Sequence, residues 1–111
     1  MKVAVVGSRQ IEVTNLGEYL PEGVTELVSG GAKGVDSCVR AYAEAYGIVY
    51  REFLPEYSRY KRGAPIKRNV QIVEYADIVI AFWDGKSKGT KHTIACCREL
   101  GKEVKVFLWE K

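Results

Sequence analysis

Three short segments of the chain combine glycine with polar side chains, and each one follows an apolar run. They read Gly7 to Arg9, Ser29 to Asp36 and Asp84 to Thr90. Glycine lets the backbone approach a ligand closely, and the exposed N–H groups at the start of a helix bind phosphate or carboxylate. The three segments therefore predict an anion-binding site, provided that the fold brings them together.

None of these segments matches an established nucleotide-binding motif by spacing alone. The phosphate-loop pattern GxxxxGK[ST] and the dinucleotide pattern GxGxxG are both missing from the sequence. Each segment is by itself as typical of a tight strand-to-helix connection as of a ligand site. The prediction depends on all three segments lying at one crevice.

Cationic side chains stand near the starts of three expected helices, where they are electrostatically unfavourable. The set consists of Lys33, Lys67, Arg68, Lys88 and Lys91. Because a helix N-terminus is electropositive, each misplaced cation costs about 0.3–1 kcal/mol when it is exposed. A phosphate bound among these helix starts would account for the whole set, whereas any single side chain could simply extend into water.

Two carboxylates adjoin the glycine segments and could act as acids or bases. Asp84 follows the most apolar run of the chain, and Asp36 lies just inside an expected helix. Asp36 could also bind a ribose hydroxyl. The alternatives are structural, because a first-turn acid favours a helix start and Asp is common in turns.

The single histidine, His92, has no partner at metal-ligand spacing, so neither a metal nor a cofactor is predicted. Its expected place is the surface. The three cysteines form no CxxC pair and are expected to be free thiols in a reducing cytoplasm. They are Cys38, Cys96 and Cys97.

Residues 57–92 carry eight Lys or Arg residues against three acids, although the net charge of the whole chain is only +3. Such asymmetry is typical of a solvated face or of an anion site. Tyr57, Tyr60 and Trp83 could stack on a nucleobase, which makes single-stranded nucleic acid a candidate partner. Core packing or a subunit interface, and so a homo-oligomer, fits these aromatic residues equally well.

The length and composition favour a single domain. The 111 residues are 47% hydrophobic and 28% charged, which suits one domain spanning residues 1–111. The longest apolar run, residues 78–83, is too short to cross a membrane, so no membrane partner is expected. A cytoplasmic protein is the interpretation that fits this composition.

Apolar periodicity alternates between strand and helix along the chain. Strands are expected at residues 3–6, 26–28, 48–53, 78–83 and 103–108, the fourth of them as the central strand. Helices are expected at residues 16–20, from Val35 to a cap at Gly47, from Pro65 with Ile66, Val70 and Val73 buried, and at residues 89–100. Residues 54–64 are expected to be irregular.

This order predicts a Rossmann-like α/β fold, an open parallel five-stranded sheet with helices on both faces. The expected strand order is 3-2-1-4-5, which places strands two, one and four side by side. Ligands bind such sheets outside the carboxyl ends of the strands, where the strand order reverses. All three glycine segments fall at those ends.

Several segments together resemble the SLOG superfamily and, within it, the small single-domain YspA-like branch. The resemblance covers nearly the whole chain. It rests on Gly7-Ser8-Arg9, Val28 to Asp36, Pro65 to Asn69, Ala81 to Gly85 and Ser87 to Thr90. The superfamily includes the Lonely-guy phosphoribohydrolases and relatives of Smf and DNA-processing protein A that bind single-stranded DNA. The resemblance implies a Rossmann-like domain that binds a nucleotide or nucleotide derivative in the crevice.

The chain departs from the Lonely-guy motif PGGxGTxxE. When the motif is aligned on Gly89-Thr90, Thr93 stands where the motif has its glutamate, and Gly85 to Ser87 replace Pro-Gly-Gly. The carboxylate expected to stabilise an oxocarbenium-like transition state in N-glycosidic cleavage is therefore missing. A hydrolase or transferase would need Asp84 or Asp36 in its place.

The residues and the resemblance together predict a domain that binds a nucleotide-derived phosphorylated ligand, as a sensor or carrier does. N-glycosidic hydrolysis or transfer and single-stranded DNA binding are the alternatives. In the binding hypothesis glycine amides hold the phosphate with cationic help, Asp36 or Asn69 binds sugar or base, and Trp83 flanks the base. The residues expected at the site are Gly7, Ser8, Arg9, Ser29, Gly30, Gly31, Lys33, Gly34, Asp36, Arg68, Asn69, Trp83, Asp84, Ser87, Gly89 and Thr90.

Overall fold

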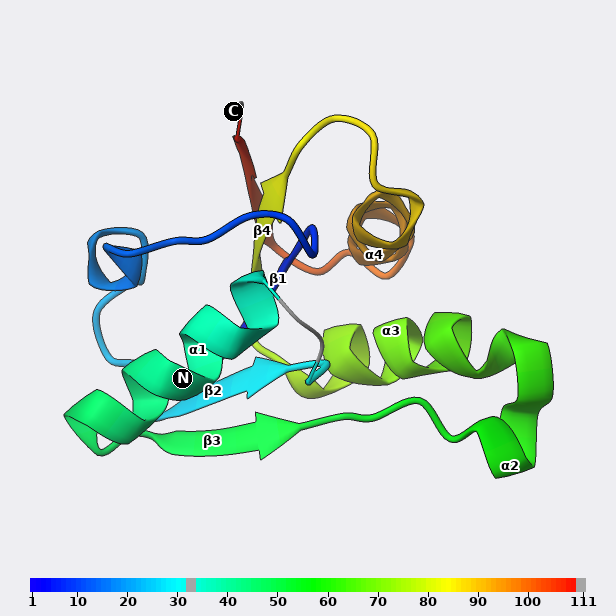
Figure 1. Cartoon of the computed structure of the whole chain (residues 1–111), viewed down its shortest axis with the longest axis horizontal. Helices are drawn as coiled ribbons and strands as arrows, with labels where there is room; N and C mark the ends of the chain where they lie inside the picture. Colours follow the sequence, from blue (N-terminus) through cyan, green and yellow to red (C-terminus); the bar gives the residue numbers. More distant parts are fainter. Residues whose placement is uncertain (32–33, 110–111) are drawn as a thin grey trace.

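The computed structural model describes residues 1–31 and 34–109. Within these ranges, five strands form one parallel sheet in the order β3-β2-β1-β4-β5 (Figure 1). The strands are β1 (Lys2–Gly7), β2 (Glu26–Ser29), β3 (Val49–Glu52), β4 (Ile78–Trp83) and β5 (Val104–Leu108). The Rossmann-like α/β fold and the expected strand order are thereby confirmed.

Helices cover both faces of the sheet. The three longer ones are α1 (Val35–Tyr46), α3 (Ala64–Tyr75) and α4 (Lys88–Glu99). Val3 and Val5 of β1 share a buried cluster with α1, whereas Ala4 and Val6 share one with α3 and α4. Because successive side chains of a strand point to opposite faces, β1 is buried between the two helical layers.

Single residues set two helix boundaries as expected from the sequence. Gly47 caps α1 in the left-handed conformation, with a φ of 65°, which glycine adopts without strain. Pro65 lies in the first turn of α3, where an N–H would have no partner within the helix. Both observations confirm the expected ends.

The expected helix at residues 16–20 and the expected central strand were wrong. The first is a single 3-10 turn, η1 (Leu16–Glu18), because Pro21 follows too soon for a longer helix. The central strand is β1, which pairs with both β2 and β4. β1 and β4 are both buried on two faces, so the degree of apolar character does not distinguish the central position.

Around the start of α3 the structure also differs from the expectation. Residues 54–64 contain a short helix, α2 (Tyr57–Tyr60), and a 3-10 turn, η2 (Lys61–Gly63). Ile66 is 54% exposed rather than buried, whereas Asn69 is buried. The N-terminal end of α3 extends past the carboxyl ends of β2 and β3 (Figure 1), and Ile66 belongs to the first turn of this helix.

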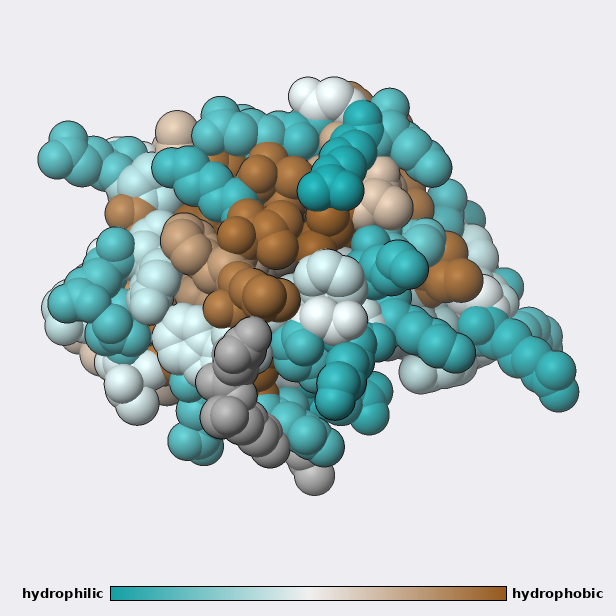
Figure 2. Space-filling view, turned by 90° about the horizontal axis from the view of Figure 1, so that it is seen from above, coloured by the Kyte–Doolittle hydropathy of each residue, from teal (hydrophilic) through white to brown (hydrophobic). Residues whose placement is uncertain are grey.

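The surface carries some apolar side chains. Figure 2 shows an apolar patch in the middle of a largely hydrophilic face. Val106 and Leu108 of the edge strand β5 are both exposed. Among the helices of residues 1–31 and 34–109, none has the length and apolar character needed to cross a membrane.

Candidate functional site

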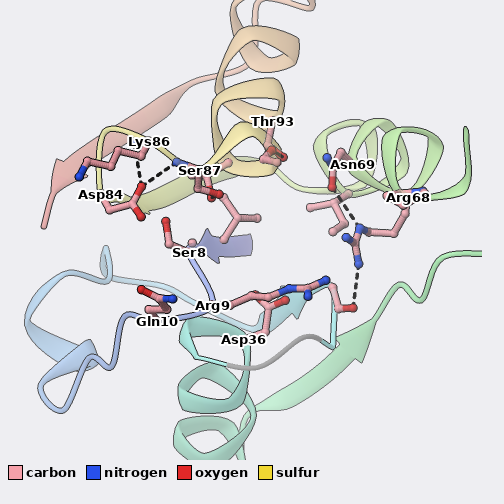
Figure 3. Close-up of a pocket in the computed structure, with 17 residues that line it drawn as sticks. Ser8, Arg9, Gln10, Asp36, Arg68, Asn69, Asp84, Lys86, Ser87 and Thr93 are labelled. Carbon is pink, nitrogen blue, oxygen red and sulfur yellow. Dashed lines mark hydrogen bonds between the residues drawn. The ribbon is translucent and has the colours of Figure 1, made fainter. Parts of the chain in front are cut away.

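A crevice of about 520 Å³ lies at the carboxyl ends of β1 and β4. The chain order reverses between these two strands, so their loops leave in opposite directions and open a cleft. Figure 3 shows polar side chains from both loops, from α1 and from α3 around this space. The lining residues are Val6, Gly7, Ser8, Arg9, Gln10, Gly30, Asp36, Pro65, Arg68, Asn69, Ile72, Asp84, Lys86, Ser87, Gly89, Thr90 and Thr93.

Ser8, just beyond β1, contributes a buried hydroxyl to the crevice wall. Its backbone N–H donates to the carbonyl oxygen of Phe82 at 3.2 Å, and its own carbonyl accepts from the N–H of Ile11 at 3.2 Å. The residue is only 3% exposed, and within the described part of the chain its Oγ has no hydrogen-bond partner. Buried polar groups are almost always hydrogen-bonded in native proteins. The hydroxyl therefore marks a place for a ligand or a water molecule.

Asp84, just beyond β4, organises its own loop. Its Oδ1 accepts hydrogen bonds from the backbone N–H groups of Ser87 at 2.8 Å and Lys86 at 2.9 Å. These two bonds, that from Ser87 first, lower the pKa of Asp84, and the nearby Ser8 hydroxyl adds a smaller effect without reaching hydrogen-bonding geometry. Asp84 is thus an ionised carboxylate, and Figure 3 shows its second oxygen on the side of Ser8.

The first turn of α4 borders the crevice, and Figure 3 shows α4 between the Asp84 loop and α3. Gly89 and Thr90 supply two backbone N–H groups that, as at any helix start, have no partner within the helix. A Cβ on Gly89 would meet no atom of the described residues within 4 Å, so the backbone is open to a ligand here. The Thr93 hydroxyl, in contrast, already donates to the carbonyl oxygen of Gly89 at 3.1 Å.

Arg68 reaches across the crevice from α3 to the loop after β2. Its Nη1 donates to the carbonyl oxygen of Gly30 at 2.9 Å, and its Nε donates to Oδ1 of Asn69 at 3.0 Å. A Cβ on Gly30 would lie 2.5 Å from Nη1, so glycine is needed for the guanidinium group to pack against the backbone. Burial lowers the pKa of Arg68, while the charge of Asp36 opposes that change and Arg9 adds to it.

Arg68, Arg9 and Asp36 thus form the second polar end of the crevice, away from Asp84 (Figure 3). Asp36 lies in the first turn of α1 and is only 7% exposed. A carboxylate is favourable at a helix start, which agrees with the structural role considered for it. Among the described lining residues, the cations Arg9, Arg68 and Lys86 outnumber the two carboxylates.

Three of the glycines expected at the site have a packing role in the structure. A Cβ on Gly7 would lie 2.5 Å from Cγ2 of Val35, and one on Gly34 would lie 2.3 Å from the carbonyl oxygen of Arg9. Gly34 and Gly31 also have positive φ angles of 74° and 72°. The chain therefore uses these glycines for turns and for close approach between its own segments.

Eleven of the sixteen expected site residues line the crevice, and four described ones do not. Trp83 is not a lining residue. Its Nε1 donates to the carbonyl oxygen of Ser87 at 3.0 Å, which stabilises the loop after β4. Ser29 is bonded to Tyr50, while Gly31 and Gly34 serve the turn. Lys33 lies outside the described residues.

The crevice also includes residues that the sequence analysis did not select. Gln10, Lys86 and Thr93 are polar, and Val6, Pro65 and Ile72 are apolar. Gln10 follows Arg9 directly, and Lys86 lies inside the third glycine segment. Including every polar residue of those segments would have found Lys86, and extending the first segment by one residue would have found Gln10.

The cations at the helix starts divide between two roles. Arg68 lines the crevice, whereas Lys67, Lys88 and Lys91 are exposed and do not line it. The alternative, extension of the side chain into water, therefore fits Lys88 and Lys91. The Lys67 ammonium instead lies 5.8 Å from the ring centroid of Tyr60.

The basic segment around α2 is separate from the crevice lining. The guanidinium group of Arg59 lies 5.3 Å from the ring centroid of Tyr60, so cations of the chain itself approach this ring. Tyr57 is 59% exposed and is the more accessible ring. Single-stranded nucleic acid binding by this segment stays a prediction.

His92 is half-buried, and its Nδ1 lies 3.4 Å from Nδ2 of Asn69, so the expectation of a surface histidine was wrong. The three cysteines are free, as expected. In residues 1–31 and 34–109, no three His, Cys, Asp or Glu side chains gather in a way that could hold a metal ion.

Comparison of the chain with models of protein families, with curated proteins and with solved structures found no match. The SLOG resemblance therefore stays a prediction from the sequence.

Proposed function

We propose that the crevice binds a phosphorylated nucleoside, with the phosphate held between two guanidinium groups and the first turn of α4. Arg9 and Arg68 line the crevice, and so do Gly89 and Thr90 of the first turn of α4. A guanidinium group matches phosphate geometry through two parallel hydrogen bonds, and a helix start adds N–H donors and positive potential.

The observation that carries this proposal is the meeting of independent hydrogen-bond donors in one crevice. The arginines come from the loop after β1 and from α3, and the amides come from α4. The buried Ser8 hydroxyl, without a partner among the described residues, lies at the same crevice. Each feature alone is common, but together they leave donor capacity that the described chain does not use.

Size and charge support a nucleotide-sized anion. Ligand sites for small molecules span roughly 300–1,000 Å³, and this crevice, at about 520 Å³, lies within that range. Its charged lining residues have a small positive excess. The resemblance of the glycine segments to the SLOG superfamily points to the same ligand class, for which a sensor or carrier role needs no catalytic group.

The Asp84 carboxylate supports a second candidate function, which is cleavage or transfer at the N-glycosidic bond of the nucleotide. An ionised carboxylate fixed by two backbone amides could stabilise the positive charge that develops on the sugar. The test is chromatography of nucleotide mixtures after long incubation with the protein and with Asp84→Asn. Free base released by the protein but not by the variant would support catalysis, and no release would reject it.

The binding proposal is tested by thermal unfolding with nucleoside mono- and diphosphates, ADP-ribose and cyclic nucleotides. A ligand at a hundredfold excess over its dissociation constant should add about 2.7 kcal/mol to the free energy of unfolding. For a domain of this size, that is a rise in Tm of roughly 8 °C or more. If no member of the panel raises Tm, the proposal is wrong.

A matched pair of variants locates the effect. Arg68→Ala and Lys67→Ala each remove one positive charge from the first turns of α3, but only Arg68 lines the crevice. We expect Arg68→Ala to remove most of the ligand-induced rise in Tm and Lys67→Ala to keep it. Equal losses in both variants would mean that general positive charge, rather than this crevice, attracts the ligand.

A further inference from the structure

Ser8 and Asp84 face each other at the point where the sheet changes direction. Ser8 follows β1 and Asp84 follows β4, and these two strands pair along their length, from Val3 with Ile78 to Gly7 with Phe82. Both residues line the crevice, and Figure 3 shows their side chains on opposite sides of a gap. They form an end of the crevice that Arg9 and Arg68 do not reach in this view.

The hydrogen-bonding capacity at this end is well defined. The Asp84 carboxylate is ionised and accepts both of its backbone hydrogen bonds through Oδ1. An ionised carboxylate accepts hydrogen bonds and donates none. The Ser8 hydroxyl can donate one and accept others, and within the described chain it does neither.

A phosphate group would be repelled between Ser8 and Asp84, because Asp84 is a fixed negative charge with its second oxygen on the Ser8 side, whereas Figure 3 shows the ammonium end of Lys86 pointing away from Ser8. A group that donates hydrogen bonds would instead be attracted, and more strongly to the ionised carboxylate than to a neutral acceptor. The two ends of the crevice therefore suit different chemical groups. The end with the guanidinium groups suits an anion, and the end with Ser8 and Asp84 suits hydroxyl donors.

We propose that Ser8 and Asp84 bind the two neighbouring hydroxyl groups of a ribose, so that the site selects ribonucleotides over deoxyribonucleotides. This inference rests on the proposed function, because it assumes that the phosphate of the same ligand lies at the arginine end. One ribose hydroxyl donates to the free oxygen of Asp84. The other exchanges a hydrogen bond with Oγ of Ser8, which gives that buried hydroxyl its partner.

The size of the selectivity follows from the loss of a hydrogen bond to a charged acceptor. Removing one such bond changes affinity by about 10- to 100-fold. A 2′-deoxy ligand loses one of the two hydroxyl groups and leaves Ser8 or Asp84 without a partner. Ribonucleotides should therefore bind at least about tenfold more tightly than their 2′-deoxy counterparts.

The experiment is calorimetric titration of the four ribonucleoside 5′-monophosphates, each compared with its 2′-deoxy counterpart. It is done with the wild-type chain, Ser8→Ala and Asp84→Asn. Asparagine keeps an oxygen for the N–H groups of Lys86 and Ser87, so the loop retains its fold, but it has no negative charge. We expect the variant of the residue that holds the 2′-hydroxyl to bring the ratio of ribonucleotide to deoxyribonucleotide affinity close to one. The variant of the other residue, which holds the 3′-hydroxyl, should weaken both kinds of nucleotide alike.

Lys67→Ala is the control, because Lys67 is exposed and lies outside the crevice lining. It should keep the ribonucleotide preference. Equal binding of ribo- and deoxyribonucleotides by the wild type would overturn this inference and leave the proposed function intact. A preference that survives in both Ser8→Ala and Asp84→Asn would overturn the assignment to these residues. If neither kind of nucleotide binds, the proposed function fails and the inference fails with it.

Discussion

At the amino end of the sheet, polar groups tie together segments that are far apart in the sequence. The backbone N–H of Lys2 donates to Oδ2 of Asp77 at 2.7 Å, the amino group of Met1 donates to Gly23 at 3.1 Å, and Lys102 donates to the carbonyl oxygen of Ala76. These contacts close the amino end of the sheet by joining neighbouring elements. They leave little for a ligand to bind.

At the carboxyl end of the sheet, Asp84 follows β4 as Asp77 precedes it, but the two residues have different partners. Asp84 bonds to its own loop, and Ser8 after β1 has a hydroxyl with no partner in the described chain. Asp77 and Asp84 both have a lowered pKa from backbone N–H donors, but Asp77 is bonded to Lys2 at the start of another strand, whereas Asp84 is bonded within its own loop and lines the crevice. The comparison teaches that the fold uses the amino end for cohesion and leaves capacity for a ligand at the carboxyl end.

The largest expected effect tests whether packing glycines hold the carboxyl end in shape. Gly34→Ala places a Cβ 2.3 Å from the carbonyl oxygen of Arg9 at a φ of 74°. We expect the free energy of unfolding to fall by about 3 kcal/mol or more, as for a strained backbone with a core clash. Urea denaturation followed by circular dichroism measures it.

Gly89→Ala is the control for Gly34→Ala, because each glycine lies at the start of a helix but only at Gly34 would a Cβ meet backbone atoms. A Cβ on Gly89 meets nothing within 4 Å among the described atoms. Alanine in a helix should raise stability by up to about 1 kcal/mol, while weakening nucleotide binding by filling open space. A strong loss of stability in Gly89→Ala would show that the first turn of α4 is packed rather than open.

The next largest effect on stability is expected when a cation is removed from either end of the sheet. Arg68 donates to the carbonyl oxygen of Gly30, and Lys102 donates to that of Ala76, and both acceptor residues are buried. Replacing either cation by alanine should lower the free energy of unfolding by about 1–3 kcal/mol, since a buried carbonyl loses a charged donor. Only Arg68→Ala should also weaken nucleotide binding in titration calorimetry. Weaker binding in Lys102→Ala would contradict the division of roles.

Acid unfolding should reflect the two carboxylates at the ends of β4. Because the folded pKa of Asp77 and of Asp84 is lowered, their stabilising contribution is present above the unfolded pKa of about 3.9. It is lost as pH falls through the folded pKa values. We expect stability to fall on acidification below about pH 5, and less steeply in Asp77→Asn and Asp84→Asn. A variant with the wild-type slope would show that its carboxylate contributes nothing in this range.

The smallest effect is expected at Ser8. Its hydroxyl has no partner to lose, so Ser8→Ala should change the free energy of unfolding by less than about 0.5 kcal/mol or increase it. Thermal unfolding without ligand measures this change. A clear loss of stability would mean that the hydroxyl is already hydrogen-bonded in the free protein.

Much of the fold could be predicted from local signals. The apolar runs at residues 3–6 and 78–83 and the cap at Gly47 identify strands and a helix end by their own chemistry. The prediction that Ile66 is buried was wrong, because burial depends on whether a distant strand covers that turn of α3. The prediction of a helix at residues 16–20, where the structure has the short η1, was wrong because a few apolar residues at helical spacing do not show whether the helix can continue.

The site could be predicted only in part. Ser8 and Asp84 were found because they follow strands, and the carboxyl ends of parallel strands meet. The packing roles of Gly7 and Gly34 could not be predicted, since the sequence does not tell whether the space beside a glycine holds a ligand or another part of the protein. The contact of Arg68 with Gly30 spans 38 residues and depends on the tertiary fold.

The most direct test of a ligand site at the carboxyl end is an NMR titration of ¹⁵N-labelled protein with the four ribonucleoside 5′-monophosphates. We expect saturable shifts of the amides of Ser8, Gly30, Gly89 and Thr90, while those of Gly23 and Asp77 at the amino end stay unchanged. Shifts confined to the basic segment around Tyr57, or no saturable shifts at the carboxyl end, would contradict the account.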